Sequence, residues 1–519
     1  MCWGWICPFA GLIDGLIGWV AKGGRNNQGS RYPSRMLFSV HSHIHTFTYT
    51  HIFTDDDDDT NNNNDIDLDE LLSTGGNSGG SAASARNAER HTQLVDALCT
   101  AADISSEKRA TKREAIFRRL FKALTQQTAG RSSLETVLKF RTDVVAACCH
   151  TSRHKAKPSE QYASCRVLEA LGVLVNDDDD DCGQDHWMDV EPYLRRIVMS
   201  THKAALVRGA ALRALALTCL VGSNDPDVCD KVLDICQSVA QVQYRNHDVP
   251  AILRATALDC WALLLTTLED VYISGKSDFY SGRGLDMLPV LQECLASSGT
   301  GTTGGIELRA AAGQCVALIH ESRWNVLDDN DNHTSDNHTS DNIGARNITE
   351  RQFTRGSWEN TAWQDIMAEI QQQLSELSTL STKQMSKRTK RQQRAAFREY
   401  AATVVDDESP EETIRLRAGN SSNSWSITTW RELVRVNFVR QSLQGGFQLQ
   451  LLTNPTLQAI LGVDASVLGI SRSMSQVEKR LIMSKGSEAA KMAYMDMTKK
   501  RRVRTNVKNH FLTVDGDEL

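Results

Sequence analysis

Two glycine-rich motifs in this chain have the residue types of known catalytic or cofactor sites. Gly299 to Gly304 reads GxGxxG, which binds dinucleotide pyrophosphates, and Gly76 to Gly80 reads GxSxG, which surrounds a nucleophilic serine. Both patterns need a buried strand before the turn. A helix-like apolar segment precedes the first motif, and polar tracts surround the second. We therefore expect neither motif to perform its chemistry.

Metal ligands are equally weak candidates. His41, His43, His45 and His51 could bind a metal ion, but histidines in such a polar tract are rarely ligands. We expect no catalytic residue, no cofactor, no metal and no small-molecule substrate, and an enzyme is the least favoured class.

Two basic clusters in the C-terminal third are the strongest candidates for a binding site. Residues 383–398 contain seven Lys or Arg and no acidic residue, covering more than one helical face. A second basic stretch, 475–508, ends in KKRRVR. Such clusters are typical of nucleic-acid contacts or nuclear import signals, because each cation can neutralise a phosphate. The candidate residues are Lys387, Arg388, Lys390, Arg391, Arg394, Arg398, Lys499, Lys500, Arg501, Arg502 and Arg504.

The net charge of the chain hides this basic character. The 519 residues include 58 Lys or Arg and 64 Asp or Glu, for a net charge of -6. Nineteen of the acidic residues lie in three runs, at 55–70, 177–181 and 328–341. The rest of the chain is therefore positively charged, which indicates an anionic partner.

An internal repeat organises the middle of the chain. Segments VRGAALRALAL from Val207, LRATALDCWAL from Leu253 and LRAAAGQCVAL from Leu308 align residue by residue, with a partial match from Gln161. Small residues at fixed places let neighbouring helices approach closely. A period near 46 residues fits the two-helix HEAT or armadillo unit. Helices are also expected between these segments, at 133–150, 190–201, 227–242 and 285–296.

The cysteines fit the same picture. The chain has thirteen, an odd number, with no CxxC pair. Several lie in apolar helical runs, which predicts small buried hydrophobic side chains rather than disulfides or zinc ligands. After the repeats, an apolar stripe from Trp363 to Leu377 predicts a helix that closes the stack.

The chain resembles the interferon-related developmental regulator family, and the motifs that show it lie in the C-terminal third. The resemblance rests on RQQRAAFR from Arg391, PEETIR from Pro410, Ser424-Trp425, Gly445-Gly446, LLTNPTL from Leu451 and EKRL from Glu478. It covers roughly residues 90–505 and departs from the family at 1–80, 177–185, 325–350 and just after Lys491. The resemblance implies an armadillo-like helical region and a non-enzymatic regulator. The resemblance further implies a role as a transcriptional co-regulator or a ribosome-binding role in translation.

Together these observations predict an all-α protein. We expect a disordered leader at 1–84, an armadillo/HEAT-like α-solenoid at 85–405 with a disordered insert at 325–350, and a helical module with a basic tail at 410–510. The expected partners are proteins, ribosomal RNA or chromatin-associated complexes, in nucleus and cytoplasm, with no membrane. The alternative is a trafficking adaptor with a peptide-binding solenoid groove, anchored by the apolar segment 1–21.

Overall fold

The structure is a computed structural model, and it describes most of the chain after residue 79. The described ranges are 80–127, 131–153, 156–175, 182–223, 225–245, 247–274, 282–296, 303–334, 361–379, 387–418 and 421–463, with Lys491 and Met495. They all belong to one compact unit, His41–Leu519. The histidines at 41–51, the GxSxG serine, the apolar segment 1–21 and the cluster Lys499–Arg504 lie outside them.

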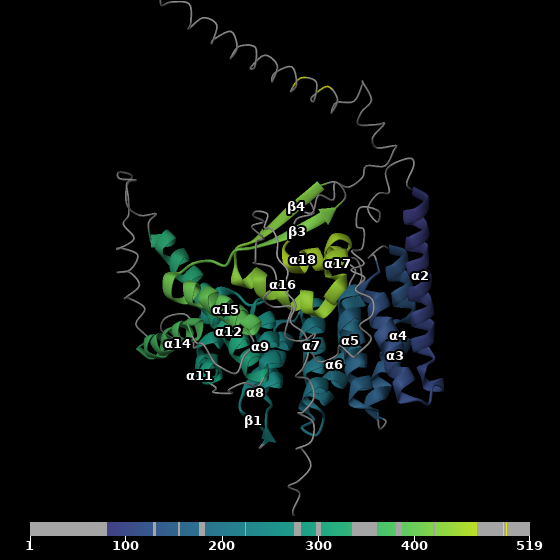
Figure 1. Cartoon of the computed structure of the whole chain (residues 1–519), viewed down its shortest axis with the longest axis horizontal. Coiled ribbons are helices and arrows are strands. Elements are labelled where there is room, and N and C mark those ends of the chain that lie inside the picture. Colours follow the sequence, from purple (N-terminus) through teal and green to yellow (C-terminus); the bar gives the residue numbers. More distant parts are fainter. Residues whose placement is uncertain are drawn as a thin grey trace, which may run out of the picture. The chain divides into compact units, whose positions relative to one another are not determined.

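The described part is mostly helical, which confirms the all-α prediction (Figure 1). The helices up to residue 334 are α2 (Gly80–Ala102), α3 (Ala110–Thr125), α4 (Arg131–Arg153), α5 (Pro158–Leu174), α6 (Cys182–Met199), α7 (Ala205–Gly222), α8 (Pro226–Ala240), α9 (Ala251–Leu265), α10 (Asp270–Ser274), α11 (Arg283–Ala296) and α12 (Thr303–Thr334). A 3₁₀ turn, η2 (Ile104–Ser106), and a two-residue hairpin, β1 (Gln243–Tyr244) with β2 (His247–Asp248), join some of them.

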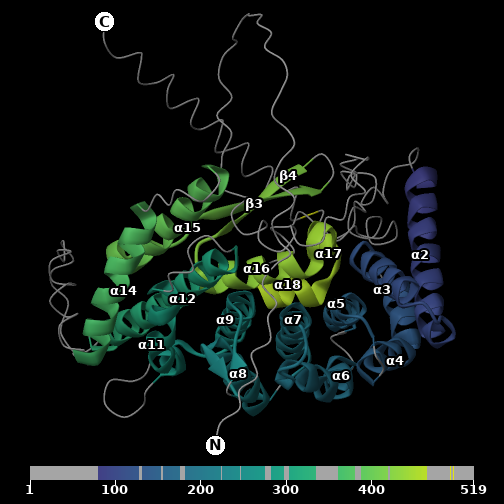
Figure 2. The same ribbon diagram turned by 60° about the horizontal axis from the view of Figure 1, so that its bottom comes forward.

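The aligned segments occupy helices that pack in sequence order. The partial match lies in α5, and the three full matches lie in α7, α9 and α12. Contacts run from α3 to α5, α7, α9 and α12 in succession, while α4, α6, α8 and α11 pack beside them (Figure 2). The first residues of the three full matches, Val207, Leu253 and Leu308, are all buried. The repeat in the sequence is thus a repeat of structural environment.

Small residues make the close packing of these helices possible. A Cβ added to Gly172 of α5 would lie 2.5 Å from Cγ2 of Thr218 on α7. Gly209 of α7 faces Thr256 of α9, where an added Cβ would meet Oγ1 at 3.4 Å. Side chains at Gly172 would force the helices apart, so the small positions set the helix spacing.

The arginine of the repeat satisfies the end of the preceding helix. Arg208 Nε donates to Val198 O at 3.0 Å, and Arg254 Nε donates to Ala240 O at 2.7 Å. The last carbonyls of a helix have no partner inside it and carry its negative dipole end. In these two repeats a guanidinium therefore ties the helix that carries it to the helix just before it.

Two segments around α12 bear on the sequence predictions. The helix α11 precedes the GxGxxG glycines, so the strand that a dinucleotide site requires is not there. At its other end α12 continues to Thr334, and its last turns enter the predicted insert at 325–350.

All six cysteines that lie in apolar helical runs at positions 148, 165, 219, 236, 260 and 315 are buried, as predicted.

The C-terminal part combines helices with one hairpin. Its elements are α14 (Thr361–Thr379), α15 (Lys387–Asp406), β3 (Glu412–Ala418), β4 (Ser421–Ile427), α16 (Trp430–Leu443), η5 (Gln444–Gly446), α17 (Phe447–Thr453) and α18 (Pro455–Leu461). The antiparallel pair β3–β4 was not predicted: Ile414, Trp425 and Ile427 are buried, while the described residues directly next to them along the strands are exposed. This alternation is the period-2 pattern of a half-buried strand, in a module that the sequence analysis predicts to be helical.

One described helix has the length and apolar composition of a membrane span. It is α7 (Ala205–Gly222), and 78% of it is buried inside the protein. A buried core helix meets the same criteria, so this match carries no evidence for a membrane.

Candidate functional site

The basic helix α15 is anchored by its C-terminal half. Phe397, Tyr400 and Val404 are buried against neighbouring helices, among them α12 and α14. The rings of Phe397 and Tyr400 meet edge to face at 5.6 Å, and Tyr400 lies 5.5 Å from the ring of Trp430 on α16. A Cβ at Gly313 of α12 would lie 2.5 Å from the Tyr400 ring, so this glycine makes room for it.

The first predicted cluster lies on α15, from its start at Lys387 to Arg398. Arg391 and Arg398 are exposed, and Arg394 is half-buried. Their spacing of three and four residues places them on one face of the helix. Among the described residues, neither Arg391 nor Arg398 forms an ion pair. Lys387, Arg388 and Lys390 lie in the same helix, but only their backbone is described.

A second arginine cluster, which the sequence analysis did not identify, lies buried between α5, α7 and α16. Glu169 of α5 pairs with Arg166 on the same helix and with Arg213 of α7, the latter at 3.4 Å. All three side chains are almost fully buried. Their charges are compensated by one another and by hydrogen bonds to α16, as buried charges require.

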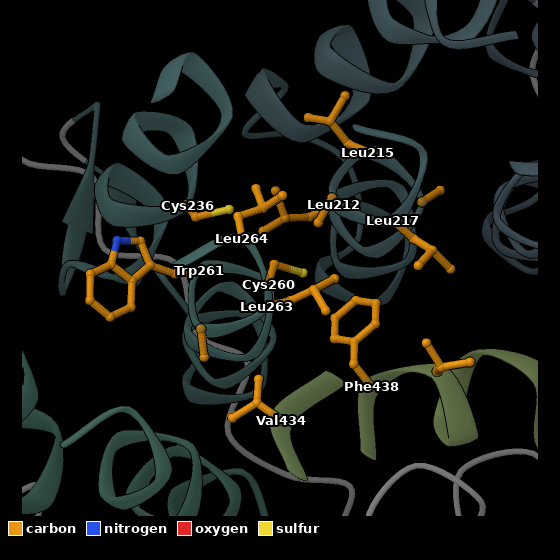
Figure 3. Packing of buried hydrophobic residues seen from close by; sticks show 14 of the residues in the cluster. Leu212, Leu215, Leu217, Cys236, Cys260, Trp261, Leu263, Leu264, Val434 and Phe438 are labelled. Atoms are coloured by element: carbon orange, nitrogen blue, oxygen red, sulfur yellow. The ribbon is translucent and has the colours of Figure 1, made fainter. Parts of the chain in front are cut away.

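These arginines bind the C-terminal end of α16. Arg166 Nη2 donates to Ser442 O at 2.8 Å, and Arg213 Nη2 donates to Phe438 O at 3.2 Å and to Ser442 Oγ at 3.0 Å. The Arg213 guanidinium also stacks 4.1 Å from the Phe438 ring centre. Phe438 and Val434 project from α16 toward α9, the helix that carries Cys260 and Leu263 (Figure 3). The last carbonyls of α16 are thus satisfied by cations, the arrangement that the helix dipole favours.

The other end of α16 is held by α12 and α9. Glu321 of α12 accepts hydrogen bonds from the backbone N–H groups of Trp430 at 2.8 Å and Arg431 at 3.1 Å. Burial raises the pKa of Glu321, although these two hydrogen bonds act to lower it. Arg431 and Arg435 both donate to the carbonyl of Thr266 at the end of α9, at 2.6 and 2.7 Å. Burial lowers the pKa of Arg435.

Gln450 on α17 and Asn454, which lies between α17 and α18, repeat this arrangement on α3 and α5. Gln450 Nε2 donates to Gln127 O at 2.6 Å just after α3, and Asn454 Nδ2 donates to Val173 O at 3.1 Å on α5. A Cβ at Gly446 would lie 2.2 Å from Thr125 O, so the backbone of η5 rests directly on the end of α3. We call α16, η5, α17 and α18 together the C-terminal clasp. It satisfies the ends of α3, α5 and α9 (Figure 2).

Part of this network had a visible signal in the sequence. Arg213 stands inside the aligned segment from Val207, and a charge there is unusual between alanines and leucines. Nothing in the sequence told which segment would face it, because Phe438 and Ser442 lie more than 200 residues later. The described residues include no group of three His, Cys, Asp or Glu arranged to hold a metal ion.

Comparison with known proteins agrees with the architecture. The family model for the interferon-related developmental regulator matches residues 58–405, well over half of the chain, from before α2 to within α15. No curated protein matches. The matched range covers the three aligned repeats and the anchored basic helix, so the chain belongs to the interferon-related developmental regulator family.

Proposed function

We propose that this protein is a non-enzymatic regulator of gene expression whose helical repeats form an armadillo/HEAT-like solenoid. Membership of its family supports a regulatory, non-enzymatic role. Within that role, we propose that α15 contacts a polyanion, with ribosomal RNA as the partner. The proposed places of action are nucleus and cytoplasm, in translation at the ribosome or as a co-regulator of transcription.

One observation carries the proposal of an anionic partner. Arg391 and Arg398 are exposed on one face of α15, among further cations, and neither forms an ion pair within the described residues. The aromatic anchor at Phe397 and Tyr400 fixes this face on the folded body. Exposed cations held in fixed places fit a phosphate backbone, which positions a protein without reading sequence.

The buried arginines argue against the adaptor alternative. An adaptor would offer the inner arginines to a foreign peptide. Here Arg166 and Arg213 are covered by α16 of the same chain and make their hydrogen bonds to it. We therefore do not propose a peptide-binding groove at this place.

The test is RNA binding by a full-length variant that carries R391E and R398E. We expect at least a tenfold loss of affinity for single-stranded RNA. The slope of log affinity against log salt should fall by about 0.7 for each phosphate that the protein no longer neutralises. The matched control is K139E with K231E, because both lysines are exposed on other helices and the net charge changes equally.

The outcomes separate a local surface from a general charge effect. An equal loss in both variants would mean that net charge alone governs binding. Unchanged affinity in R391E/R398E would show that α15 is not the surface that binds RNA. Sedimentation of cell lysate with and without RNase then reports whether RNA carries the association with ribosomes. Persistence after RNase would indicate a protein partner instead.

A further inference from the structure

A pair of buried thiols joins α7 and α8. Cys219 lies near the end of α7 and Cys229 lies near the start of α8, and their Sγ atoms are 3.6 Å apart. Cys219 is fully buried, and Cys229 is 7% exposed. A disulfide has an S–S distance of about 2.05 Å, so only a small approach separates the two sulfurs from a bond.

The hydrogen bond between the two sulfurs shifts the pKa values of the two thiols in opposite directions. The hydrogen bond with Cys219 lowers the pKa of Cys229, against burial and the charges of Asp230 and Asp225, which raise it. The same hydrogen bond and burial raise the pKa of Cys219. Cys229 is thus the thiol that ionises first, and it is also the more exposed one. The thiolate is the nucleophile in thiol chemistry.

We propose that Cys219 and Cys229 form a redox site that reacts with hydrogen peroxide and closes to an intramolecular disulfide. The Cys229 thiolate attacks one peroxide oxygen, the O–O bond breaks, and hydroxide leaves, which gives a sulfenic acid. Sγ of Cys219 then attacks the sulfenic sulfur, the S–O bond breaks, and water leaves. Overall two thiols and one peroxide give one disulfide and two waters. The thiols lose the two electrons that the peroxide gains.

The bond would fix two helices of the stack to each other. Cys219 lies one turn before the end of α7, where Gly222 packs against the backbone of α6. Cys229 lies in the first turns of α8, after the N-cap Asp225, whose side chain accepts from the N–H of Asp227. Oxidation would thus join two helix ends that already pack together and would not require a new arrangement of the helices.

Cys236 provides an internal control on the same helix. It is fully buried, and burial raises its pKa. Among the described residues, none places a sulfur against it as Cys219 does against Cys229. A general attack of peroxide on buried cysteines would modify Cys236 as well. The proposed site predicts that Cys219 and Cys229 react while Cys236 stays unmodified.

The experiment uses the folded full-length chain and mass spectrometry. The protein is treated with a small molar excess of hydrogen peroxide, quenched with catalase, unfolded in denaturant and alkylated with N-ethylmaleimide. Trypsin cleaves after Arg213 and Lys231, so one peptide, 214–231, carries both Cys219 and Cys229, and the next carries Cys236. We expect peptide 214–231 without alkylation and two hydrogens lighter than the dithiol form, while Cys236 stays fully alkylated.

Variants distinguish the order of the two steps. In C219A the second step is removed, so we expect dimedone to label a sulfenic acid at Cys229. In C236A the disulfide should form as in the unchanged chain. Full alkylation of Cys219 and Cys229 at a peroxide exposure that modifies other cysteines would overturn the proposal. So would higher oxidation of Cys229 without a disulfide. The experiment on the unchanged chain needs no variant, so a folding defect in C219A leaves this test intact.

Discussion

At the scale of single residues, two buried carboxyl groups, Glu169 and Glu307, differ in how the chain compensates them. Glu169 lies between two guanidinium groups, and each guanidinium also binds carbonyls of α16. Glu307 on α12 is 6% exposed, and neither of its carboxylate oxygens has a hydrogen-bond partner among the described residues. Burial, and then the charge of Asp259, raise the pKa of Glu307 from 4.5 to about 8.

This raised pKa makes stability depend on pH. Between about pH 4.5 and pH 8 the folded protein holds a proton on Glu307 that the unfolded chain has released. The contribution of Glu307 to the free energy of unfolding is therefore fully present below pH 4.5 and is lost as the pH rises toward 8. We expect E307Q to match the unchanged protein near pH 5 and to be the more stable of the two at pH 8.5.

Urea unfolding of both proteins across this pH range is the measurement. The difference between the two midpoints isolates Glu307 from other carboxylates, which lose stability in acid. E191Q is the control, because Glu191 forms a partly exposed i,i+4 pair with Arg195. Parallel curves for E307Q and the unchanged protein would show that Glu307 is charged in the folded state.

At the scale of elements, the C-terminal clasp depends on close backbone contact with α3. Two adjacent glycines offer a clean comparison. A Cβ at Gly446 would lie 2.2 Å from Thr125 O, whereas a Cβ at Gly445 would meet nothing within 4 Å. Overpacking a tight contact usually costs about 1–3 kcal/mol. We expect G446A to lower the free energy of unfolding by that amount, and G445A to change it by less than about 0.5 kcal/mol.

Thermal unfolding followed by circular dichroism measures this comparison. Both changes add the same methyl group to neighbouring residues of η5, so the two variants differ mainly in that Gly446 is buried against α3 and Gly445 is exposed. Hydrogen exchange in α17 and α18 should also speed up in G446A, since these helices follow directly after η5. Equal unfolding midpoints for the two variants would mean that the backbone of η5 does not pack tightly against the end of α3.

The fold and the site were predictable to different extents. The helices of the repeats were predictable because small and apolar residues recur at fixed places, and this pattern is local. The hairpin β3–β4 was missed because its polar positions, such as Ser424 and Ser426, hide the alternation of Trp425 and Ile427. The buried cluster around Glu169 could not be predicted, since its partners come from segments far apart in the chain. Of the basic residues, sequence alone identified Arg391 and Arg398 as charged, and the structure adds that they are exposed.

At the scale of the whole molecule, the clasp makes the repeats and the C-terminal helices one cooperative structure. It supplies the groups that satisfy the ends of α3, α5 and α9, and it covers the charges of Arg166 and Arg213. Without the clasp these guanidinium groups would keep Glu169 but would have no carbonyl partners on α16, and apolar faces of α5, α7 and α9 would meet water. Breaking a buried polar network in this way is strongly destabilising.

Two shortened chains test this dependence. One ends at residue 463, after α18, and keeps the clasp; the other ends at residue 405, where the family match stops, and lacks it. We expect the chain ending at 405 to unfold at a clearly lower temperature, to bind the dye ANS and to aggregate, because it exposes the surface that α16 covers. The chain ending at 463 should unfold in one transition near that of the full chain. Equal unfolding temperatures for the two shortened chains would show that the repeats are stable without the clasp and that α16 is only an attached segment.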